Sequence, residues 1–191
     1  MLNELLLKFA TWLDGFQSST DLHEALYMYG WVEGTHVLTL MLFLGMLFVI
    51  DLRLLGVAFT DIPVSKVVDR LDKPMMIGFC IMLISGALLF YAIPIRSTQS
   101  IWFRAKVVML ILAGINAFLI RNMTRESGVN WDNDPVPPTR IRVGAGLSIA
   151  FWTLVIAFGR MMAYDWWDCH KDIPYFMYWA AGCVNELAAF E

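Results

Sequence analysis

Four long apolar stretches constrain the fold of this 191-residue chain more than any other feature. They cover about residues 31–50, 75–95, 101–120 and 143–164, and each carries few charged residues. A helix of about 20 residues, rising 1.5 Å per residue, crosses a hydrocarbon core of about 30 Å. Because lipid offers no hydrogen bonds to an open backbone, such segments must be helical. The pattern predicts an all-α integral membrane four-helix bundle, a single membrane domain over residues 1–191.

The composition supports a lipid environment. Hydrophobic residues make up 59% of the chain and charged residues only 16%, whereas soluble domains contain about 25% charged residues. The net charge is −3 and no basic run is present, so the sequence excludes nucleic acid as a partner. We expect the lipid bilayer to be the main partner, with a second copy of the chain or other subunits of a membrane complex as further partners.

Both ends of the chain are predicted to lie at the membrane surface. In residues 1–16, apolar side chains recur at helical spacing with polar residues between them, which is typical of an amphipathic interfacial helix. Packing of this helix on the end of the bundle is the alternative. Residues 165–191 form a tail on the same side, and its moderately apolar stretch from Ile173 to Phe190 is expected to be an interfacial or half-inserted helix. Cys169 and Cys183 in this tail are candidates for a disulfide outside the cytoplasm.

The connections between the spans differ in length. Residues 51–74 are polar, and Pro74 suits the first turn of the second spanning helix. Residues 96–100 make a short turn, so the helices on either side of it are expected to be antiparallel neighbours. Residues 121–140 are expected to form a long polar loop that ends in a stiff proline-rich stretch.

The distribution of lysine and arginine sets the expected orientation. The two loops that follow the first and third spans hold most of these residues. Because such loops usually face the cytoplasm, we expect both termini on the periplasmic side of a bacterial inner membrane.

Ionisable residues inside the spans are the candidates for function. The first and third spans start on the side where the fourth ends, so Glu33, His36, Arg104, Lys106 and Arg160 are expected to share one leaflet. Charged groups at that depth are costly and usually face a bundle interior or a wet cavity. We therefore predict a polar site at which His36, Lys106 and Arg160 converge. The alternatives are basic side chains that snorkel to the headgroups and a core histidine bonded to a neighbouring helix.

A single b-type haem is the first function that these residues suggest. His36 lies about one turn inside the bundle and would be the axial ligand, while Arg104, Lys106 or Arg160 would neutralise the propionates. The second ligand would be His170 or a methionine, or the iron would stay five-coordinate. With three histidines in the chain, a di-haem cytochrome with four axial histidines is excluded. The expected role is then electron transfer.

Two further functions stay open. Glu33 and His36 are three residues apart on one helix face, a spacing that carboxylate-bridged metal sites use. With His23 or His170 from the outer loops they would hold a single metal ion, which favours copper-like metal handling or small-solute transport. In the last hypothesis the chain is a non-catalytic structural or assembly subunit, whose polar groups only bond helices together.

Several short motifs resemble those of an uncharacterised bacterial family of small four-helix inner-membrane proteins. They are Glu-Gly-Thr-His at 33–36, Gly45, Asp-Leu-Arg-Leu-Leu-Gly at 51–56 and Trp-Phe-Arg-Ala-Lys at 102–106, with the similarity covering about residues 25–160. More loosely, the chain is similar to the membrane domain of copper resistance D-type proteins and to helical b-type cytochromes. These relatives imply haem or copper handling at His36, although the second helical histidine of the haem proteins is missing.

Asp51 and Arg53 end the first predicted span. A charge cluster that fixes the depth of the helix end is the simplest interpretation of this pair. A contact to a partner protein, or a gating contact, is the alternative.

Overall fold

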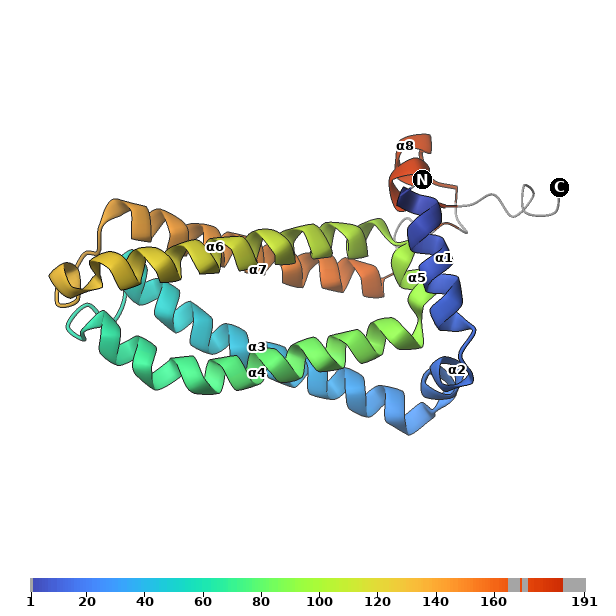
Figure 1. Ribbon diagram of the computed structural model, residues 1–191, viewed down its shortest axis with the longest axis horizontal. Coiled ribbons are helices and arrows are strands. Elements are labelled where there is room, and N and C mark those ends of the chain that lie inside the picture. The colour runs from blue at the N-terminus through green and yellow to red at the C-terminus, as the bar shows by residue number, and fades with distance from the viewer. Residues whose placement is uncertain (1, 165–168, 170–171, 184–191) are drawn as a thin grey trace. The chain divides into compact units, whose positions relative to one another are not determined.

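The fold is helical throughout the part of the chain that the structure describes. The structure is a computed structural model that describes residues 2–164, 169 and 172–183. In chain order the helices are α1 (Leu2–Asp14), α2 (Gln17–Glu24), α3 (Leu26–Leu55), α4 (Val64–Ala92), α5 (Pro94–Thr98), α6 (Ile101–Trp131), α7 (Thr139–Ala163) and α8 (Tyr175–Ala181) (Figure 1). The all-helical prediction is confirmed for these residues.

The chain divides into two compact units. The first unit contains Met1–Gly34, Ser85–Val108 and Ile156–Glu191, and the second unit contains Thr35–Ile84 and Met109–Val155. The four long helices α3, α4, α6 and α7 each have residues in both units, whereas α1, α2, α5 and α8 belong to the first unit alone.

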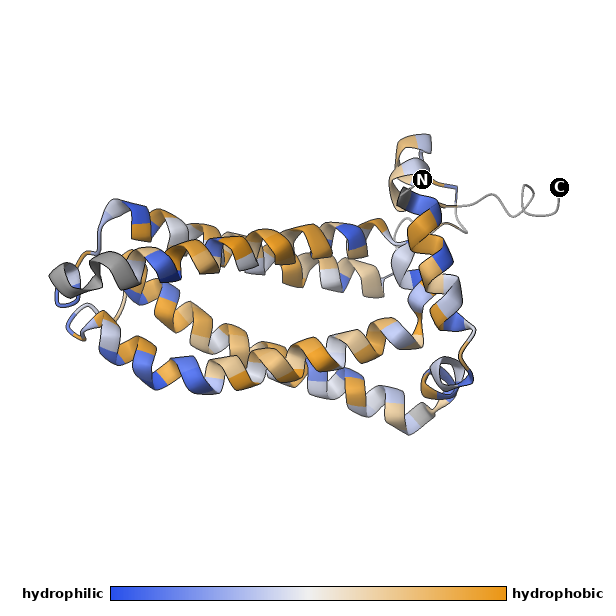
Figure 2. Ribbon diagram, viewed as in Figure 1, coloured by the Kyte–Doolittle hydropathy of each residue, from blue (hydrophilic) through white to orange (hydrophobic). Residues whose placement is uncertain are grey.

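Four helices within the described residues are long and apolar enough to cross a membrane, as the sequence predicts. They are Tyr27–Leu55, Val64–Ala92, Ile101–Thr124 and Thr139–Ala163. Their lengths of 24 to 29 residues exceed the roughly 20 that a hydrocarbon core requires. Apolar residues fill the middle of each of these helices, and polar residues gather near the ends (Figure 2).

The second spanning helix begins earlier than predicted. α4 starts at Val64, so Pro74 lies inside the helix rather than in its first turn. The polar stretch before Pro74 is helical because Val64, Val67, Val68 and Leu71 recur at helical spacing and pack on one apolar cluster. The mean hydropathy of this segment is low because charged residues lie between the valines, so the average does not reveal its apolar face.

Other boundaries differ for similar reasons. α6 continues to Trp131, well beyond residue 120, and the Trp131 side chain is only 5% exposed because it packs in the same apolar cluster. The expected turn at 96–100 overlaps the short helix α5, which begins at Pro94 and ends at Thr98. At the N-terminus α1 matches the helix expected over residues 1–16, and a second helix that was not predicted, α2, follows after the extended backbone of Phe16.

The second unit is a four-helix packing with two apolar clusters. The first cluster centres on Phe43 and Trp152, whose rings meet edge to face at 4.8 Å, and includes Leu44, Met82, Ala113 and Val155. The second cluster comprises Ile50, Leu54, Val64, Trp131, Ile141 and Ala145. In lipid such clusters stabilise helix contacts through close van der Waals packing. They fix the rotation of α3 and so determine where its polar side chains point.

Candidate functional site

His36, the predicted ligand, contacts α4. Its side chain is half-buried, and its Nδ1 lies 3.0 Å from the carbonyl oxygen of Met82. A carbonyl oxygen can only accept a hydrogen bond, so Nδ1 must carry the hydrogen and donate it. In a neutral imidazole the lone pair is then on Nε2. The Met82 carbonyl therefore selects the tautomer and orientation that metal-ligating histidines usually have.

The rotation of α3 turns His36 toward the interior of the second unit. Thr39 and Phe43, three and seven residues later on the same helix face, are only 8% and 4% exposed. On the opposite face, Val37 and Leu38 are 47% and 59% exposed. The imidazole thus shares the buried face of α3.

Arg104 joins three segments of the first unit to α6. Its Nη1 donates to the Asn3 side-chain oxygen and to the Ala180 carbonyl, both at 2.8 Å, and its Nε donates to the Thr98 carbonyl at 3.0 Å. These partners belong to α1, α8 and α5, respectively. The bonds engage N–H groups that the haem hypothesis assigns to a propionate, so Arg104 has a structural role that the sequence pattern did not predict.

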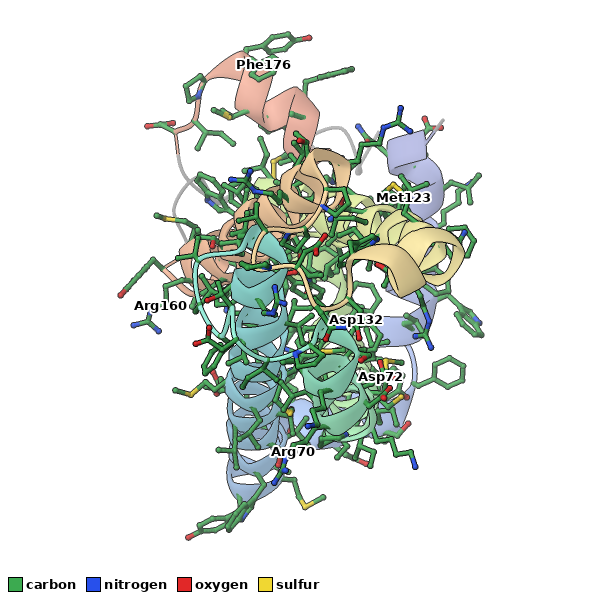
Figure 3. All side chains as sticks on the ribbon, turned by 90° about the vertical axis from the view of Figure 1, so that its left-hand side faces the viewer. Arg70, Asp72, Met123, Asp132, Arg160 and Phe176 are labelled. Atoms are coloured by element: carbon green, nitrogen blue, oxygen red, sulfur yellow. A yellow bond between two sulfur atoms is a disulfide. The ribbon has the colours of Figure 1, made fainter. Side chains whose placement is uncertain are left out.

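Lys106 and Arg160 lie differently within the first unit. Lys106 is half-buried and runs over α7 at Gly159, where an added Cβ would lie 3.6 Å from its Nζ. Arg160 is exposed and donates to the Tyr164 hydroxyl through Nε and Nη2, at 3.2 Å and 2.9 Å. Its side chain extends away from the ribbon (Figure 3). Arg160 therefore forms a surface pair with Tyr164, and Lys106 is the cation that packs between helices.

The predicted convergence of His36 with Lys106 and Arg160 involves both units. His36 belongs to the second unit, whereas Lys106 and Arg160 belong to the first. That these three residues lie in the same leaflet therefore stays a prediction, which follows from the alternating direction of successive spans.

The other predicted metal ligands lie on the surface or outside the described residues. Glu33 is exposed, and the exposed His23 ring packs edge-on against Tyr29 at 5.8 Å. His170 lies outside the described residues. In the part of the chain that the structure describes, no group of three or more His, Cys, Asp or Glu side chains could hold a metal ion. A site of Glu33, His36 and a loop histidine thus gains no support from the described residues.

Arg53 is a buried arginine at the end of α3 that bonds to two loops. The side chain is fully buried, its Nε donates to the Ile62 carbonyl at 2.7 Å, and its Nη2 donates to the Asp134 carbonyl at 3.0 Å. We call Arg53, Ile62 and Asp134 the Arg53 cluster. It joins the loop after α3 to the loop after α6. Arg53 thus does more than set the depth of a helix end, since it bonds two loops to one helix.

Gly56 completes this end of α3. Its φ of +73° is in the left-handed region, and an added Cβ would lie 3.1 Å from the Pro135 carbonyl oxygen. Only glycine combines this backbone conformation with so close an approach. The Asp-Leu-Arg-Leu-Leu-Gly motif is therefore explained by the packing of the loops.

Two buried polar contacts in the second unit were not predicted. Asn116 donates from Nδ2 to the Gly144 carbonyl at 2.9 Å and so bonds α6 to α7. Ser148, one turn later on α7, bonds to the Asp51 carboxyl group. A lone polar side chain in an apolar span is a usable sequence signal for such contacts, because it must find a partner in lipid. Which group the side chain bonds to can be found only from the three-dimensional structure.

Cys169 and Cys183 form a disulfide, with their Cα atoms 5.5 Å apart. The bridge closes a loop that contains α8. Gly182, next to Cys183, has a φ of +68°, and an added Cβ would lie 2.5 Å from Arg104 Nη2. The disulfide therefore follows directly on the segment that packs against Arg104.

One family model matches this chain, and it is described as a family of unknown function (DUF6644). The match covers residues 22–165. It includes α3, α4, α5, α6 and α7 in full, and therefore His36, Lys106 and the Arg53 cluster. No curated protein and no solved structure matches the chain.

Proposed function

The chain belongs to the DUF6644 family of unknown function, and we propose that it is a membrane protein that holds one b-type haem through His36. The observation that carries the proposal is the hydrogen bond from His36 Nδ1 to the Met82 carbonyl at 3.0 Å. This bond gives the imidazole the tautomer of an axial ligand and fixes its plane.

The chemistry of haem suits a chain with one oriented histidine. The porphyrin itself supplies four nitrogen ligands, so the protein needs to provide only one or two more. A bound haem would supply one-electron transfer. The protein's part is to orient the imidazole through the Met82 carbonyl and to hold it on the buried face of α3.

The test is an optical spectrum of the protein purified from haem-replete cells. We expect a Soret band and a b-type pyridine haemochrome in the wild type, and loss of both in His36→Ala and in His36→Gln. The glutamine variant is decisive, because its amide can still donate to the Met82 carbonyl but cannot ligate iron as imidazole does. His23→Gln, at an exposed histidine, is the matched control and should keep the spectrum. A colourless wild type, or a His36→Gln variant with an unchanged spectrum, would contradict the proposal.

A structural or assembly subunit is the second candidate, and a specific observation favours it. The His36–Met82 bond also ties α3 to α4, in the same way that Asn116 ties α6 to α7. If tying helices were the whole role of His36, His36→Gln would preserve the fold and any assembly of the chain with other subunits. The spectrum of the wild type separates the two candidates.

We also propose that both termini face the periplasm of a bacterial inner membrane. Disulfides persist in oxidising compartments, and the Cys169–Cys183 bridge lies beyond the last span, which agrees with the distribution of lysine and arginine. In intact spheroplasts, a membrane-impermeant maleimide should label Cys169 and Cys183 only after reduction by a membrane-impermeant reductant. A Cys80→Ser background removes the free thiol in α4. Labelling that needs permeabilised membranes would reverse the orientation.

A further inference from the structure

Asp51 is a carboxyl group buried inside a spanning helix. Its side chain is 2% exposed, and its neighbours Ile50 and Leu54 on α3 are 8% and 3% exposed and belong to the second apolar cluster. Ionisable groups in spanning helices are costly, and those that persist usually serve ion or proton pathways. The haem proposal gives Asp51 no role, so its position needs a separate explanation.

The carboxyl group has one polar partner in the described part of the chain. The Ser148 hydroxyl on α7 bonds to it, and Ser148 is itself only 5% exposed. The second oxygen, Oδ2, is buried and has no hydrogen-bond partner among the described residues. A hydroxyl group compensates part of the cost of burial but brings no opposite charge.

Arg53 does not neutralise Asp51. Although the two residues are close in sequence, the Arg53 Nη1 is also buried and also lacks a hydrogen-bond partner within the described residues. The rest of the guanidinium bonds to the Ile62 and Asp134 carbonyls. These two atoms therefore do not bond to each other, and no ion pair within 4.0 Å joins the Asp51 and Arg53 side chains among the described residues.

Among the side chains that the structure describes, the other ionisable groups at this end of the second unit are engaged elsewhere or exposed, and Asp61 in the loop after α3 is one of the exposed groups. Arg142 donates to the Leu55 carbonyl at 3.2 Å, Arg121 lies 3.9 Å from Asp72, and Asp132 accepts from Ser65. The remaining charged side chains of α4, α7 and the loop after α6 are exposed: Lys66, Asp69, Arg70, Lys73, Asp134 and Arg140. The burial of Asp51 is therefore compensated by a neutral group.

We propose that Asp51 is a proton-binding site of the second unit. An uncompensated carboxylate in a packed apolar interior costs far more than an unpaired hydroxyl group, so the packed bundle holds the carboxyl group in its neutral form. One oxygen accepts from Ser148 while the other carries the proton. Ionisation releases one proton and leaves a buried negative charge, so proton release requires the helices around Asp51 to loosen or to admit water. This role is independent of haem binding.

Infrared spectroscopy of the full-length protein in nanodiscs tests the protonation state directly. At neutral pH we expect the carbonyl stretch of a protonated carboxyl group, shifted in deuterated water and absent in Asp51→Asn. Asp69→Asn, at an exposed aspartate on α4, is the matched control and should keep the band. Ser148→Ala is a second variant, in which loss of the hydrogen bond shifts the same band to higher frequency. Identical spectra for wild type and Asp51→Asn would overturn the proposal.

Thermal unfolding against pH gives an independent measurement. An amide mimics a protonated carboxyl group, so Asp51→Asn should unfold at nearly the wild-type temperature at low pH. In the wild type the folded state keeps a proton that the unfolded state releases, so wild-type stability should fall relative to Asp51→Asn as the pH rises. Wild-type stability that rises relative to Asp51→Asn as the pH rises would show an ionised Asp51. Stabilisation by sodium over potassium that is lost in Asp51→Asn would show a cation site instead, and either result overturns the proposal.

Discussion

Replacing Arg53 by alanine is expected to lower the free energy of unfolding of the second unit by about 2–5 kcal/mol. The variant removes the donors to the Ile62 and Asp134 carbonyls, at 2.7 Å and 3.0 Å, from a site in which Arg53 is fully buried. Each hydrogen bond from a charged donor contributes about 1.5–3 kcal/mol, and loss of the fully buried arginine stem adds a cavity. Both loops at this end of α3 should loosen together.

Chemical or thermal unfolding in detergent measures this loss. Arg70→Ala is the matched control, because it removes an arginine from the exposed face of α4 in the same unit and should change stability by no more than about 0.5 kcal/mol. Arg53→Lys should fall between the two variants, since an ammonium group lacks the planar fork that reaches two carbonyls. Equal stability of Arg53→Ala and Arg70→Ala would show that the Arg53 cluster is not needed for folding.

Replacing Arg104 by alanine is expected to release α1 and α8 from the first unit while the spanning helices stay folded. The variant loses the bonds to Asn3, Thr98 and Ala180, and each hydrogen bond from a charged donor contributes about 1.5–3 kcal/mol. We expect local opening of these segments to become easier by at least about 2 kcal/mol, which speeds amide exchange by a factor of about 30.

Hydrogen exchange with mass spectrometry resolves this effect by segment. Peptides that cover α1 and α8 should exchange faster in Arg104→Ala, and peptides that cover Phe43 or Trp152 should not. Arg160→Ala is the matched control, since the Arg160 guanidinium bonds to Tyr164, only four residues along the chain at the end of α7, and joins no separate segment through these bonds. Uniform acceleration across the whole chain in Arg104→Ala would show global destabilisation and contradict a local role.

The four spans were predictable because a bilayer demands long apolar helices and leaves few alternatives. Helix ends were less predictable, because they depend on side chains that alternate with charged residues. Val64 and Trp131 extend α4 and α6 beyond the apolar runs, since burying these two side chains on the second cluster outweighs the polarity of their neighbours. A hydropathy value averaged over a window of residues does not show which face of a helix is buried.

The candidate site was predictable only in part. The expectation that His36 faces the interior came from the cost of a polar side chain in lipid, and His36 is half-buried on the same helix face as the buried Thr39 and Phe43. Its partner is a main-chain carbonyl, which any residue at position 82 would supply, so no sequence pattern could identify it. Arg104 and Arg160 look equivalent in sequence, yet one bonds three segments and the other lies on the surface. Only their contacts in the folded structure distinguish the roles of these two arginines.

The partners of Arg53 have a consequence for how related chains should vary. Both acceptors are peptide oxygens, so exchanging the side chains of Ile62 and Asp134 leaves the contact intact provided the loops follow the same path. We expect homologous sequences to keep an arginine and a glycine at the positions of Arg53 and Gly56. The amino-acid composition of the loops after α3 and α6 should vary much more.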